Sequence, residues 1–71
     1  MVKMQEKKRL DRADFHTWLA IVYADTKAEV VPGVEIVDKP DDSDIEPGSG
    51  IYTGDGHSGI LLSDGTWSWD E

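Results

Sequence analysis

Cysteine is absent from all 71 residues. This excludes disulfides, thiolate zinc sites and cysteine nucleophiles. Because small secreted domains usually depend on disulfides, the absence predicts a reducing, cytoplasmic location. Long apolar runs are also missing: the longest, from Trp18 to Ala24, has seven residues and is too short to span a bilayer. No apolar run of signal-peptide length follows the basic residues near the N-terminus, so we expect a soluble protein without a membrane partner.

Positive charge is scarce. Fifteen acidic residues oppose seven basic ones, for a formal net charge of −8. Such a chain repels phosphate backbones and anionic lipids, which disfavours direct binding to nucleic acid, whereas it attracts basic protein surfaces. Residues 1–27 carry six bases and four acids (6 − 4 = +2), and residues 28–71 carry one base and eleven acids (1 − 11 = −10). The composition therefore predicts a polarised molecule with a basic protein as its partner.

Large apolar side chains are few, since Leu, Ile, Val and Phe make up only 16 of the 71 residues. A chain of this length forms one domain and buries only about 60% of its unfolded surface. A two-domain enzyme with a deep cavity is therefore excluded, and we expect a single small domain with a thin core.

The first part of the chain has the pattern of a helix. Residues 1–10 are predicted to be a basic tail or the start of that helix. Phe15, Leu19 and Val22 recur at helical spacing, which predicts a helix over residues 12–28. The run from Ile21 to Tyr23 also favours a strand, so the two signals conflict; the expectation is a helix.

The middle of the chain is rich in turn formers and acids. Pro32-Gly33 is typical of a type II turn, and a strand is expected over residues 34–37. Residues 38–50 contain one large hydrophobe, Ile45, among prolines, glycines and acids, which predicts an acidic flexible loop.

The last third predicts a three-stranded meander over residues 51–69, with a turn at residues 54–57 and a hairpin turn at Asp64-Gly65. The fold class predicted is therefore α+β, with one helix packed on a small antiparallel sheet. The strand at residues 66–70 has an unprotected edge, which is compatible with a homodimer.

No motif supports catalysis, a cofactor or a metal. Asp42, Asp44 and Glu46 have the first spacings of a calcium loop, but Pro47 stands where glycine is required and Thr53 where a bidentate glutamate is required. The two histidines have neither metal-ligand spacing nor the surroundings of a catalytic triad. We therefore predict that the protein is not an enzyme.

Trp67 and Trp69 alternate along the last predicted strand, which places both on one face. Under one interpretation they are core residues that pack against Phe15 and Leu19. Under the other they form a binding surface, because tryptophan is enriched at interface hot spots.

The leading hypothesis is a small acidic protein-binding module, an inhibitor or nucleic-acid-mimicking decoy whose carboxylates occupy the phosphate sites of a basic partner. Small inhibitors of phages and mobile elements are similar in size and charge only. The alternative is a structural adaptor that docks through the aromatic sheet face. The predicted partner-binding residues are Glu35, Asp38, Asp41, Asp42, Asp44, Glu46, Asp55, Asp64, Trp67 and Trp69.

Overall fold

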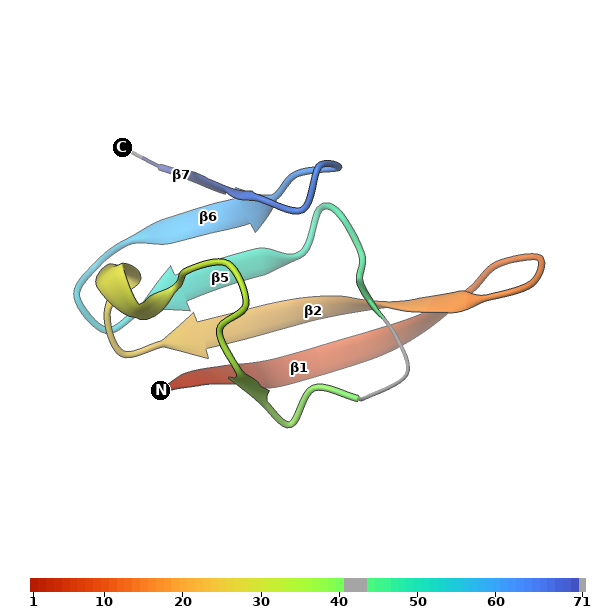
Figure 1. The fold of residues 1–71 in the computed structure, drawn as a ribbon, viewed down its shortest axis with the longest axis horizontal. Coiled ribbons are helices and arrows are strands. Elements are labelled where there is room, and N and C mark those ends of the chain that lie inside the picture. Colours follow the sequence, from red (N-terminus) through yellow and green to blue (C-terminus); the bar gives the residue numbers. More distant parts are fainter. Residues whose placement is uncertain (41–43, 71) are drawn as a thin grey trace.

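A single mixed β-sheet dominates the computed structural model, which describes residues 1–40 and 44–70. The strand order is β3-β1-β2-β5-β6-β7, of which β1, β2, β5, β6 and β7 are labelled in Figure 1. β4 also pairs with β2. In the described residues the helical part is one 3-10 turn, η1 (Lys27–Glu29). The strands are β1 (Val2–Asp11), β2 (His16–Ala24), β3 (Ile36–Val37), β4 (Asp44–Ile45), β5 (Gly50–Thr53), β6 (Ser58–Leu61) and β7 (Trp67–Trp69). The predicted α+β fold, with one helix on an antiparallel sheet, is therefore wrong.

The predicted helix over residues 12–28 and the predicted tail over residues 1–10 are replaced by an antiparallel hairpin of β1 and β2. Burial along β2 has a period of two, with Ala20, Val22 and Ala24 buried and Ile21 exposed. The strand preference of this segment prevails because β2 is hydrogen-bonded on both sides, to β1 and to β5. Tertiary pairing of this kind outweighs local helix periodicity.

The strap, residues 25–39, follows β2, contains η1 and β3, and crosses one face of the sheet (Figure 1). The predicted turn at Pro32-Gly33 is confirmed: Val34 N–H donates to Val31 O at 3.1 Å, and Gly33 has φ of 83°. The strand expected at residues 34–37 shortens to β3, which pairs in parallel with β1. The acidic loop expected at residues 38–50 contains β4 and the first residue of β5, so that prediction is wrong there.

The predicted meander is present as β5, β6 and β7, joined in antiparallel pairs. Both of its loops contain Asp-Gly, with the glycine in the left-handed region: Gly56 at φ 94° and Gly65 at φ 87°. Thr53 N–H donates to His57 O, and Leu62 N–H donates to Thr66 O, both at 2.8 Å, closing two three-residue loops. Glycine at this position is what such hairpin loops require.

The core lies on the sheet face that the strap crosses, called the inner face below. Its buried side chains are small, and Val22 is fully buried. Val30, Val34 and Ile36 of the strap pack against them. The buried core residues are Val2, Met4, Ala20, Val22, Ala24 and Ile51. The strap therefore covers the inner face as a single layer of chain. Beside the β6–β7 hairpin this cover leaves a groove.

Candidate functional site

The groove lies between the strap and the β6–β7 hairpin and has a volume of about 940 Å³. This is at the upper end of the size of binding pockets in proteins. Apolar side chains form most of its wall, as is typical of such sites. The apolar lining residues are Phe15, Val30, Val31, Pro32, Val34, Ile36, Ile45, Pro47, Leu61, Leu62, Trp67 and Trp69.

Trp67 and Trp69 point to the same side of β7, as the sequence predicted, and both line the groove. Each is half-buried and packs against the core cluster. Lys27 Nζ lies 5.3 Å from the ring centre of Trp69, and the His57 ring meets Trp69 edge-on at 6.5 Å. Each tryptophan therefore contacts the core and also presents part of its side chain to the groove. The predicted packing on Phe15 and Leu19 is not seen, since Phe15 is 59% exposed and Leu19 38%.

The backbone of β7 adds hydrogen-bonding groups beside the groove. Asp70 N–H donates to Ser58 O at 2.9 Å, so Asp70 turns its main chain toward β6. Because alternate residues of an antiparallel strand point their main-chain groups to opposite sides, Trp67 and Trp69 direct theirs away from β6. β7 is the last strand of the described sheet. The groove is thus bordered by an open strand edge.

Charge at the groove is mainly negative. Its charged lining residues are Lys39, Asp44, Glu46 and Asp64. Asp44 is exposed at the start of β4. Asp64 accepts hydrogen bonds from Thr66 Oγ1 at 2.7 Å and from Thr66 N–H at 3.0 Å, which hold its pKa below the usual value.

Glu46 is fixed by two side chains from the β1–β2 hairpin. Thr17 Oγ1 donates to one carboxylate oxygen at 2.7 Å, and Arg12 pairs with the other at 2.5 Å. The Thr17 hydrogen bond, followed by that of Arg12, lowers the pKa of Glu46. Glu46 therefore stays ionised at neutral pH, but its charge is partly neutralised within the chain.

Asp38 and Asp55, two more of the predicted carboxylates, do not line the groove. Asp38 has φ of 66° and lies 3.7 Å from Lys3 Nζ. Asp55 sits in the β5–β6 turn, where it accepts hydrogen bonds from Thr53 Oγ1 and from the Lys27 N–H; the Thr53 bond is the main cause of its lowered pKa. Asp41 and Asp42 lie outside the described residues. The expected site is thus brought together only in part.

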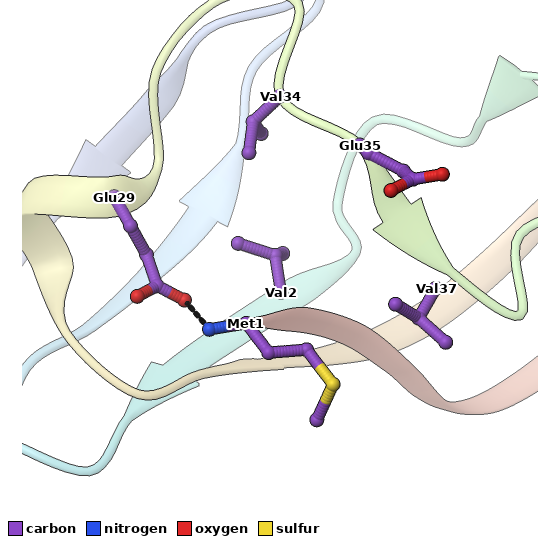
Figure 2. Close-up of a pocket in the computed structure, with 6 residues that line it drawn as sticks. All are labelled: Met1, Val2, Glu29, Val34, Glu35 and Val37. Carbon is purple, nitrogen blue, oxygen red and sulfur yellow. Dashed lines mark ion pairs between the residues drawn. The ribbon is translucent and has the colours of Figure 1, made fainter.

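Glu35 lines a second, smaller hollow of about 380 Å³ between the strap and the start of β1 (Figure 2). Its neighbours there include Val34, Val37 and Glu29. Glu29 is already engaged by the Met1 amine at 2.5 Å. Both apolar and acidic side chains line this hollow, and neither Trp67 nor Trp69 is among them.

Sequence reasoning missed the strap wall of the groove and the residue that joins β4 to β5. Ser49 is 1% exposed. Its hydroxyl donates to Glu46 O at 2.7 Å and accepts the Ala20 N–H at 3.0 Å, which replaces a ladder bond where β4 and β5 are interrupted. A lone serine in a Pro-Gly-Ser-Gly run carries no signal for this role. For the strap wall the sequence did contain a signal, namely the valines on both sides of Pro32-Gly33.

The structure also bears on metal binding and on membrane insertion. Within residues 1–40 and 44–70, no group of three or more His, Cys, Asp or Glu side chains is placed to hold a metal ion. None of the helices described there is long and apolar enough to cross a membrane. No family model, no curated protein and no solved structure matches the chain. The groove is therefore the feature of the molecule from which a function can be inferred.

Proposed function

We propose that the chain is a protein-binding module that holds an extended, basic segment of a partner protein in the groove. The observation that carries the proposal is the apolar groove with Trp67 and Trp69 in its wall and three carboxylates against one lysine among its charged lining residues. Tryptophan supplies a large contact area at binding hot spots, and the carboxylates select a cationic partner.

The open edge of β7 supports an extended ligand. A strand laid along β7 could hydrogen-bond to the outward main-chain groups of Trp67 and Trp69, which is a common mode of peptide recognition. Alternate side chains of that strand would then enter the groove or meet solvent. The acidic module and the aromatic docking face, separate hypotheses at the sequence level, describe one site in this proposal.

A decoy function stays within the proposal as the case in which the partner normally binds nucleic acid. We favour peptide binding in the groove over an array of carboxylates that imitates phosphates. Two of the carboxylates that such an array would use, Asp38 and Glu46, already pair with Lys3 and Arg12 of the same chain. Competition between double-stranded DNA and the module for a captured partner tests the decoy function separately.

Binding of a short peptide of alternating valine and lysine, followed by fluorescence anisotropy, tests the proposal. We expect binding that weakens as salt rises, and no binding of the matching valine–glutamate peptide. Asp44→Lys should weaken binding about fivefold, the effect of about 1 kcal/mol for an exposed charge. Glu6→Lys is the control, since Glu6 is exposed on β1 and does not line the groove. Equal effects of the two variants, or equal binding of both peptides, would overturn the proposal.

A further inference from the structure

The sheet face opposite the strap, called the outer face below, carries exposed apolar side chains on three adjacent strands. Ile60 is 56% exposed, Tyr52 43% and Ile21 42%. They alternate with the buried residues of the same strands, which places them on the outer face. The strap residues that pack on the sheet contact the core on the inner face. Among the described residues, then, the sheet is a single layer with one apolar face open, and sheets normally bury such a face.

The exposed side chains form one continuous surface. Tyr23 and Tyr52 are in register, and their rings meet at 5.2 Å. In the next row, Gly50 lies between Ile21 and Ile60. Because Gly50 has no side chain, this row has a shallow notch with an isoleucine on each side. The notch can receive a side chain from a facing sheet.

The two margins of the outer face carry different charged side chains. Lys3 of β1 is in register with Tyr23, and the same row continues through Tyr52 to Ser58. Ser58 Oγ donates to the Asp70 carboxylate at 3.1 Å, which puts an acid at the β7 end of the row. Lys3 also lies 3.7 Å from Asp38, and Glu6 of β1 is in register with Ile21. The β1 margin therefore carries both lysines, Lys3 and Lys8, with Glu6 and Asp38 beside them, whereas the β6–β7 margin carries Asp70 and, among the described residues, no cation in these rows.

We propose that the outer face binds a second copy of the chain, forming a two-layered sandwich about a two-fold axis parallel to the strands. This rotation places the β1 margin of each copy over the β6–β7 margin of the other, so that Lys3 approaches the Ser58–Asp70 pair. It also places β2 over β5, where Ile21 meets the Gly50 notch. An axis across the strands would instead place β1 over β1 of the other copy, so that the lysine-bearing margins would face each other. Aligned packing of two sheets about such an axis is a common arrangement.

Sedimentation velocity of the full chain over a concentration series tests the proposal. We expect a shift from the 7.9 kDa monomer to twice that mass. Ile60→Glu and Tyr52→Lys, both at exposed positions, should leave a folded monomer by circular dichroism. Val31→Glu is the control, because Val31 is 53% exposed but lines the groove, and it should leave the dimer intact.

Exchanging the charges of Lys3 and Asp70 tests the direction of the two-fold axis separately. Lys3→Asp and Asp70→Lys should each raise the dimer dissociation constant about two- to thirtyfold, because the two-fold axis repeats the exposed ion pair, and the double variant should restore it. A chain that stays monomeric at its highest soluble concentration, or a dimer that survives Ile60→Glu, would overturn the proposal. A double variant no better than the single ones would overturn the axis. None of these results bears on peptide binding in the groove.

Discussion

At the scale of single residues, two buried or half-buried polar groups join parts of the chain that are far apart in sequence. Ser49 supplies an acceptor for Ala20 N–H, and Glu46 joins the β4 region to Thr17 and Arg12. Both lie in a segment predicted to be a loop, because prolines and acids dominate its composition. What composition could not show is that β2 provides hydrogen-bond donors for this segment.

Ser49→Ala should lower the free energy of unfolding by about 1–3 kcal/mol, because it leaves a buried N–H of Ala20 without an acceptor. Urea denaturation followed by tryptophan fluorescence measures the change. Ser63→Ala is the matched control, since Ser63 is exposed in the β6–β7 turn. A loss as large at Ser63 as at Ser49 would contradict this role.

Acid should destabilise the fold through Glu46. Its pKa in the folded state is lowered by Thr17 and Arg12, so the unfolded chain takes up the proton first. The stabilisation is complete above the ordinary value of 4.5 and is lost as pH falls through the folded value. Glu46→Gln should therefore show a shallower loss of stability as pH falls below 4.5 in urea titrations. An unchanged slope would show that the Glu46 contacts do not contribute.

At the scale of elements, the hairpin turns and the meander could be predicted because their signals are local: Asp-Gly and Pro-Gly pairs fix the backbone within a few residues. The β1–β2 hairpin could not be predicted, because the charged run from Glu6 to Arg9 has no strand pattern. It becomes a strand only by pairing with β2, and a bulge at Gln5, where the register shifts between Met4 and Glu6, corrects the alignment. The helix period of Phe15, Leu19 and Val22 was coincidental, since Phe15 and Leu19 stay exposed.

Gly59 tests how β6 and β7 are held together. A Cβ atom built there would lie 2.7 Å from Ser68 O, a backbone atom that cannot move aside cheaply. Gly59→Ala should destabilise the fold by about 1–3 kcal/mol, as overpacking does. Gly50→Ala is the control, because its nearest atom lies at 3.9 Å and its effect should be small. Urea denaturation at low protein concentration compares the two, and equal effects would contradict the close approach of β6 and β7.

At the scale of the whole molecule, the sequence predicted the imbalance of charge but not its arrangement. The basic first part becomes β1 and one margin of the sheet, whereas the acids are spread over the strap, the turns and the groove. Several of them are held by hydroxyls or by cations of the same chain, as at Asp55 and Glu46. Among the described residues, the acids predicted to bind a partner lie beside the two tryptophans only where Asp44, Glu46 and Asp64 line the groove.

The most direct test of the proposed function is an NMR titration of the ¹⁵N-labelled chain with the valine–lysine peptide. Binding in the groove predicts that the amide shifts concentrate in residues 30–39 and 61–69, with the N–H groups of Trp67 and Trp69 among the largest. The amides of Ile21 and Tyr52 should move little. Shifts confined to the outer face, or spread evenly over all acidic residues, would contradict binding in the groove.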